Sequence, residues 1–199
     1  MENRFYEEMA GLLRLRVPFE ALYTSVFLIK AEQGIALVDC ATTDEDVDGY
    51  ILPALREEGL TLADVDVLVL SHKHSDHAGG RHRILELVPK IEVVTDERML
   101  FDGICTYALP GHLNECIGVL DTRTNTLIAC DGLQGAGVDK YRCSLQSKDL
   151  YRETIEKIER DSRIENLLFS HAYEPWNCDK AIGREAVLCC LEDCLHYVK

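Results

Sequence analysis

One pattern of strands and helix occurs twice along this chain, and it constrains the fold more than any other feature. Each copy is a hairpin whose second strand ends in an aspartate, then a helical segment, then a strand that ends in Ser-His. The hairpins span residues 25–39 and 116–131, the helical segments 46–60 and 148–160, and the strands 65–72 and 164–171. The repeat aligns Asp39 with Asp131 and His72 with His171, and it places a seven-residue insertion in 132–147. The chain is therefore expected to fold as two similar halves.

The two halves predict an α+β protein. If their sheets pack face to face, helices over 80–88 and 182–197 would cover the outer faces, which gives an αββα four-layer sandwich. The second of these segments has apolar residues at helical spacing. No linker rich in proline, glycine or serine interrupts the chain, so we expect one domain over residues 1–199.

The composition of the chain excludes several classes of partner. Thirty-five acidic residues against 21 basic ones give a net charge of −14, which disfavours nucleic acid and anionic membrane surfaces. No stretch approaches the roughly 18 apolar residues that a membrane span needs. The amino terminus lacks the pattern of a signal peptide, and the nine cysteines contain no Cys-x-x-Cys pair. These features predict a cytoplasmic protein with reduced thiols and leave both a monomer and a homo-oligomer open.

A dense group of metal-binding residue types follows the first Ser-His strand. Four such side chains stand within six residues, namely His72, His74, Asp76 and His77. In an extended loop His72 and His74 point to one side, while a tightening at Ser75 turns Asp76 and His77 toward a second ion. We therefore expect a metal site here rather than a solvated loop.

Three residues further along the chain complete the candidate ligand set: His112 in a Pro-Gly-His turn, Asp131 and His171. Alone, His112 or His171 would more often be an ordinary hydrogen-bonded histidine. Five imidazoles and two carboxylates suit two divalent ions, with zinc favoured and iron or manganese also compatible. Two ions, two aspartates and one bridging hydroxide leave a charge of about +1, which attracts an electron-rich oxygen. His82 and His196 are interpreted as exposed helix residues.

In this order, the residues resemble the metallo-β-lactamase superfamily, whose hallmark is a His-x-His-x-Asp-His loop followed by a Gly-His, an Asp and a last His. The resemblance spans residues 39–171 and implies the αββα sandwich. It also implies that His72, His74 and His112 hold one ion, that Asp76, His77 and His171 hold the other, and that Asp131 bridges them. Asp39 would orient the ligand loop from behind. Leu113-Asn-Glu-Cys116 replaces the family's usual Thr-Pro-Gly, and Ser170-His171-Ala172 replaces Gly-His-Gly.

The function predicted from these residues is a dinuclear, metal-dependent hydrolase. A bridging hydroxide, whose parent water has its pKa lowered from near 15.7 toward roughly 7, would attack an ester, thioester, lactone or amide carbonyl of a small molecule. Asp76 is the candidate acid for the leaving group, and Tyr173 and Trp176 are candidate pocket residues. Lys73 is expected to be solvated, and Cys40 and Cys130 to fill space at strand ends.

Two alternatives share this fold. One is a di-iron oxidoreductase; such relatives typically have Glu where this chain has His74. The other is a phosphodiesterase or nuclease, which the net charge of −14 disfavours. A binding scaffold without catalysis is disfavoured by the complete ligand set.

Overall fold

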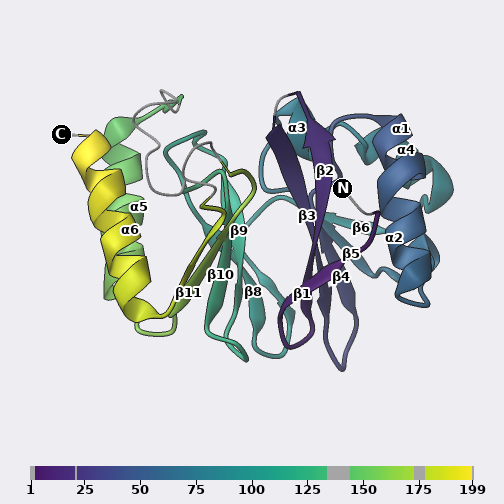
Figure 1. The fold of residues 1–199 in the computed structure, drawn as a ribbon, viewed down its shortest axis with the longest axis horizontal. Helices are drawn as coiled ribbons and strands as arrows, with labels where there is room; N and C mark the ends of the chain where they lie inside the picture. Colours follow the sequence, from purple (N-terminus) through teal and green to yellow (C-terminus); the bar gives the residue numbers. More distant parts are fainter. Residues whose placement is uncertain (1–2, 21, 134–143, 173–177, 199) are drawn as a thin grey trace. The chain divides into compact units, whose positions relative to one another are not determined.

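The structure is a computed structural model that describes residues 3–20, 22–133, 144–172 and 178–198. The chain divides into two compact units, Met1–Thr95 and Asp96–Lys199. Each unit contains one six-stranded mixed sheet together with helices (Figure 1). The boundary falls between the two copies of the predicted repeat. Among the described residues, no helix has both the length and the apolar character needed to cross a membrane.

The sheet of the first unit follows chain order from one edge to the other. Its strands are β1 (Tyr6–Met9), β2 (Leu12–Phe19), β3 (Leu22–Lys30), β4 (Ile35–Val38), β5 (Val67–Val69) and β6 (Glu92–Val94). β1 to β4 pair antiparallel, whereas β4, β5 and β6 pair parallel. The carboxyl ends of β4 and β5 therefore lie side by side at the same edge of the sheet.

The first unit has several helices, most of which lie along one face of its sheet (Figure 1). They are α1 (Asp44–Asp46), the π-helix η1 (Val47–Ile51), α2 (Leu52–Glu57), the 3-10 helix η2 (Leu62–Asp64), α3 (Ser75–Ala78) and α4 (Arg81–Leu87). The predicted helix over 46–60 is present as the run α1, η1 and α2, which begins after the capping box of Thr43. The core of this unit joins Leu15, Leu28 and Leu37 of the sheet to Ile51 and Leu55 of the helices.

The second unit repeats this plan. Its strands are β7 (Met99–Phe101), β8 (Ile104–Ala108), β9 (Ile117–Asp121), β10 (Thr126–Cys130), β11 (Asn166–Phe169) and β12 (Lys180–Ile182), and its helices are α5 (Lys148–Arg160) and α6 (Arg184–Tyr197). β10 and β11 pair parallel, and the other neighbours pair antiparallel. Figure 1 shows α5 and α6 along one face of this sheet, where Tyr151 and Ile155 of α5 and Leu191 of α6 join the core.

The structure confirms the predicted repeat within each unit. The hairpin β3–β4 is followed by helix and by β5, just as the hairpin β9–β10 is followed by α5 and β11. The strands β5 and β11 are shorter than the predicted segments 65–72 and 164–171, because the chain leaves the sheet before each Ser-His pair. Most of the predicted insertion, residues 134–143, lies outside the described residues.

Candidate metal centre

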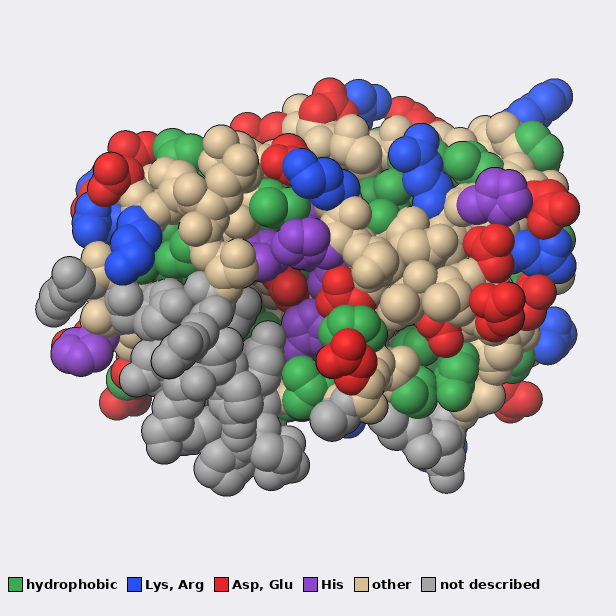
Figure 2. Space-filling model, turned by 90° about the horizontal axis from the view of Figure 1, so that it is seen from above, with side chains coloured by type: hydrophobic (Ala, Val, Ile, Leu, Met, Phe, Trp, Pro, Cys, Tyr) green, Lys and Arg blue, Asp and Glu red, His purple; other side chains and the backbone are tan. Residues whose placement is uncertain are grey.

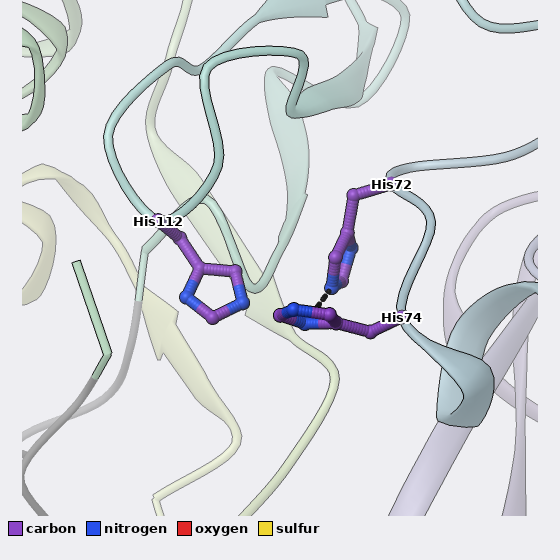
Figure 3. A group of neighbouring side chains, drawn as sticks. All are labelled: His72, His74 and His112. Atoms are coloured by element: carbon purple, nitrogen blue, oxygen red, sulfur yellow. Dashed lines mark hydrogen bonds between the residues drawn. The ribbon is translucent and has the colours of Figure 1, made fainter. Parts of the chain in front are cut away.

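The predicted ligand loop of the first unit lies directly after β5. His72 and His74 stand on the loop, and Asp76 and His77 lie in α3. His72 and His77 are buried. The rings of His72 and His74 are in contact, with His72 Nε2 2.9 Å from His74 Nδ1, the interaction dashed in Figure 3. The loop thus turns several nitrogen and oxygen donors toward one another within a single unit.

Asp39, fully buried at the end of β4, holds this loop from behind. Its carboxylate accepts hydrogen bonds from the Ser71 backbone N–H and the Ser71 hydroxyl, both at 2.8 Å. His77 Nδ1 lies 2.7 Å from Asp39 Oδ2. Because a carboxylate only accepts, a neutral His77 carries its proton on Nδ1 and its lone pair on Nε2. Asp39 therefore fixes His77 in the tautomer that can bind a metal through Nε2.

The lone pair of His77 faces a second acceptor. His77 Nε2 lies 3.3 Å from Asp76 Oδ2. Two acceptors facing each other at this distance repel unless a cation or a proton lies between them. Two ligands of a tetrahedral zinc, each about 2.0–2.1 Å from the metal, lie about 3.3 Å apart. The donor pair therefore fits a metal such as zinc.

Two glycines let the ligand loop dock against the turn that follows β4. A Cβ atom on Gly79 would lie 1.8 Å from the carbonyl oxygen of Thr42, and one on Gly80 would lie 2.3 Å from that of Cys40. The Cys40 N–H donates to the His77 carbonyl at 2.8 Å, and the Gly79 N–H donates to the Ala41 carbonyl at 3.0 Å. The backbone of α3 is thereby fixed to the chain segment that carries Asp39.

Cys40 lies in the same turn and is fully buried. Burial, and then the charge of Asp39, raise the pKa of its thiol far above the ordinary range. A thiol that stays protonated is a poor nucleophile. Its place in the apolar core of the first unit agrees with the interpretation of Cys40 as a residue that fills space.

In the second unit, His112 lies in the turn between β8 and β9 (Figure 3). Gly111 before it has a φ of 146°, and a Cβ atom there would lie 2.6 Å from Tyr151 Cβ. His112 Nδ1 is 2.6 Å from the Ser144 carbonyl oxygen. Since a carbonyl only accepts, Nδ1 bears the proton and Nε2 carries the lone pair. That Nε2 lies 3.9 Å from Asp131 Oδ2, beyond the distance of a direct hydrogen bond.

Asp131 and His171 follow the parallel strands β10 and β11, whose carboxyl ends share one edge of the sheet. Both side chains are buried, and His171 Nε2 lies 3.3 Å from Asp131 Oδ1. Cys130 before Asp131 has a φ of 48°, a left-handed conformation that turns the chain as it leaves the strand. The second unit therefore gathers His112, Asp131 and His171 in one place.

The remaining predicted residues divide into two groups. Tyr173 and Trp176 lie outside the described residues. His82 and His196 are exposed, and His82 Nδ1 lies 3.1 Å from Asp44 Oδ2 on the surface. No role was predicted for Ser71 or for the Ser144 carbonyl. The repeated Ser-His pair was a visible signal for Ser71, whereas a backbone carbonyl 32 residues from His112 has no sequence signal.

The molecular surface combines both charges. Figure 2 shows acidic and basic side chains intermingled on the face seen from above, with histidine side chains visible among them. Several surface arginines form ion pairs with acidic neighbours, such as Arg163 with Asp161 at 2.7 Å.

Comparisons with known proteins agree with this description. The sequence model of the Metallo-beta-lactamase superfamily matches residues 20–103, a range that includes Asp39 and the ligand loop. Over 48 residues, 24% of this chain, the sequence is 46% identical to Recombination protein 2 of Haemophilus influenzae. The match spans only 6% of that relative's length.

Solved structures match nearly the whole chain. The metallo-beta-lactamase FIM-1 from Pseudomonas aeruginosa, in its mono-zinc form, is 13% identical with a TM-score of 0.74, over 98% of this chain and 93% of that one. A metallo-beta-lactamase from Hirschia baltica is 14% identical with a TM-score of 0.73, over 98% and 97%. A metallo-beta-lactamase family protein from Thermus thermophilus is 15% identical with a TM-score of 0.68, over 96% and 80%.

At these identities the likeness establishes the fold, and it confirms the predicted α+β, metallo-β-lactamase-like class. The sequence match adds the ligand loop, and both units carry the histidine and aspartate clusters that the predicted metal chemistry needs. The chain therefore has the metallo-β-lactamase fold, and its residues 20–103 match the sequence model of that superfamily.

Proposed function

We propose that this protein is a dinuclear, metal-dependent hydrolase. In this proposal one set of ligands is His72, His74 and His112, and the other is Asp76, His77, Asp131 and His171. As the resemblance to the superfamily implies, Asp131 would be shared by both ions. The observation that carries the proposal is the fixed lone pair on His77, which faces Asp76 because Asp39 holds the proton on the opposite nitrogen. In the second unit His112 supports it as well, because the Ser144 carbonyl holds its proton on Nδ1 and leaves the lone pair on Nε2.

The donors favour zinc. Imidazole nitrogens and carboxylate oxygens suit an ion of intermediate softness, and the proposed sets contain both types. Iron and manganese accept the same ligands, so the native metal follows from supply as well as from the site. Two bound divalent ions would supply a nucleophile at neutral pH and would polarise the oxygen under attack.

The chain's own residues would prepare this chemistry. Asp39 and the Ser144 carbonyl hold the protons of His77 and His112 away from the metal side. The partly exposed Asp76 is proposed to pass a proton to the leaving group. The buried ligands His77, Asp131 and His171 would exclude bulk water from their side of the reaction.

The substrate class that fits best is a small molecule with an ester, thioester, lactone or amide carbonyl. A net charge of −14 supports a small substrate over a polyanion such as nucleic acid. Phosphodiester hydrolysis is the second candidate, and one observation favours it: the 48-residue match is to a protein named for recombination.

The test begins with the metal content of the purified protein by elemental analysis. Turnover of chromogenic esters, thioesters, lactones and phosphodiesters is then measured before and after chelation. We expect about two zinc ions per chain and hydrolysis of a carbonyl substrate that chelation abolishes. His74→Ala should lose metal and activity, whereas Lys73→Ala, an exposed neighbour on the same loop, should keep both.

Each other outcome has a defined meaning. Turnover of phosphodiesters alone would replace the carbonyl substrate with the second candidate. Bound iron without hydrolysis would point to the redox class. A protein that binds no divalent metal under any condition would overturn the proposal as a whole.

A further inference from the structure

The side chain of Ser71 stands between Asp39 and His72. Its hydroxyl lies 2.8 Å from Asp39 Oδ2 and 3.0 Å from His72 Nδ1. We propose that Ser71 is a positioning residue, which transmits the orienting effect of Asp39 to His72 and so makes His72 a metal ligand. This inference rests on the proposed function, because it concerns the same ligands.

The proton positions follow from the partners. A serine hydroxyl has one proton, and Ser71 donates it to the Asp39 carboxylate. Its oxygen can therefore only accept from His72, so the proton of a neutral His72 must lie on Nδ1. The lone pair is then on Nε2, the nitrogen that faces His74 at 2.9 Å. Without the hydroxyl, nothing in this pair of contacts would select the Nδ1 tautomer.

Burial makes the hydroxyl hard to replace. Asp39, Ser71 and His72 are 0%, 1% and 4% exposed. Bulk water has little access to take over the hydrogen bonds of a missing side chain, and in a buried network each such bond counts for more than at the surface. The Ser71 N–H also donates to Asp39 Oδ1, which keeps the serine on the carboxylate through two bonds.

The Asp39 carboxylate thereby orients both His72 and His77, which the proposed function assigns to two different ions. Asp39 acts on His77 directly, at 2.7 Å, and on His72 through Ser71. Removal of the hydroxyl should therefore weaken the ion held by His72 and leave the ion held by His77 in place. This selectivity separates a positioning role from a general loss of stability, which would affect both ions.

The experiment compares Ser71→Ala with Ser71→Thr, which keeps a hydroxyl, and with Ser75→Ala, which removes an exposed hydroxyl at the start of α3. Zinc binding is measured by competition with a chromogenic chelator. In the metal-free protein, long-range ¹H–¹⁵N spectra of labelled histidine report which nitrogen of His72 carries the proton.

We expect wild-type His72 to carry its proton on Nδ1. Ser71→Ala should weaken one of two zinc-binding steps by about 10- to 100-fold, the range typical for lost partners of metal ligands. Ser71→Thr should restore that step, and Ser75→Ala should match the wild type.

A proton on Nε2 of His72 in the wild-type protein would overturn the inference without any variant. Equal weakening of both zinc steps in Ser71→Ala would also overturn it. If the protein binds no zinc, the proposed function fails, while the spectra of the metal-free protein still decide the role of Ser71.

Discussion

At the scale of single residues, the candidate centre depends on proton placement as much as on ligand identity. An imidazole binds a metal only through a nitrogen without a proton, and the partner of the other nitrogen decides which one that is. Asp39 decides it for His77, and the Ser144 carbonyl decides it for His112. Neither partner would touch a metal, yet both determine whether their histidines can.

Replacement of Asp39 by asparagine tests this dependence. The amide can direct an N–H at the histidine proton, so we expect zinc affinity to fall by about 10- to 100-fold. Ser71 and His77 donate to the Asp39 carboxylate in the buried site, and the loss of this acceptor should lower the free energy of unfolding by about 1–3 kcal/mol. Chelator competition and urea unfolding measure the two effects. Asp44→Asn, the same change at a more exposed site, is the control, and equal zinc affinity in both variants would contradict the role given to Asp39.

A methyl group on Gly79 tests the close packing behind the ligand loop. Gly79→Ala would place Cβ against the Thr42 carbonyl oxygen, so the backbone must move. We expect a loss of about 1–3 kcal/mol in unfolding free energy. Gly49→Ala, where no atom lies within 4 Å of the new Cβ, should instead be neutral or stabilise by up to about 1 kcal/mol. Urea unfolding of both variants checks the difference, and similar values would argue against tight docking at Gly79.

At the scale of elements, the sequence predicted best those helices and strands that depend on neighbouring residues, such as a helix with a capping residue and one apolar face. The predicted helix over 148–160 is α5, because Ser147 caps its first turn and one face carries Tyr151 and Ile155. Strand β2 was not predicted, and within it Arg14 occupies a buried position. That arginine is buried against Phe27 of β3 and lies 3.1 Å from Glu8 of β1, and these contacts between strands are not visible in the sequence of β2 alone.

The candidate ligands were predictable for a similar reason. The compact run from His72 to His77 is local, and the strand ends that carry Asp131 and His171 follow from the repeat. The hydrogen bond between His112 and Ser144 was not predictable, because it joins a turn to a carbonyl that any residue could supply. The π-helical turn η1 between α1 and α2 was likewise not predictable, because the spacing of apolar residues there did not distinguish it from an α-helix.

The turn that follows α5 provides a prediction on pH. Asp161 accepts from the Arg163 backbone N–H, Nε and Nη2, and these bonds hold the pKa of its carboxyl below the ordinary value. A lowered pKa means that the carboxylate stabilises the folded state at neutral pH and loses this effect as the pH falls through the folded-state pKa.

Asp161→Asn should therefore be less stable than the wild type at pH 7, and the difference should shrink below about pH 4. Urea unfolding at pH 7 and pH 3 measures it. Asp193→Asn, an exposed change on α6, should show little difference at either pH. A stability gap for Asp161→Asn that grows toward acid pH would contradict the assignment.

At the scale of the whole molecule, the proposed metals link the site to stability. The ligands come from four segments, which follow β5, β8, β10 and β11, so a bound ion would favour the folded chain over the unfolded one. The stabilisation by zinc should reach about 2.7 kcal/mol when free zinc exceeds its dissociation constant 100-fold. Thermal unfolding at increasing zinc concentration measures this shift. Magnesium, which prefers oxygen ligands, should have little effect, and a melting temperature that ignores zinc would contradict the linkage.

The repeat itself differs between the units in one respect that the sequence alignment concealed. Val38 pairs with Val69, two residues before Ser71, and Ile128 pairs with Leu168, two residues before Ser170. Asp39 directly follows its paired residue, whereas Asp131 comes three residues after Ile128, beyond a shift in register. Judged from the sheets, the counterpart of Asp39 is Ala129, so the two aspartates are not equivalent.

That offset bears on how such a protein could be rebuilt. An engineer who replaced one unit with a copy of the other would obtain the same sheet and the same Ser-His ending. The copied aspartate would nevertheless lie at a different distance along the chain from the last residue pair of its strand, because Asp39 follows that pair directly and Asp131 follows Ile128 by three residues. A symmetric version of this fold would therefore need strands of changed length. The position of each aspartate depends on where its strand ends rather than on the choice of residue alone.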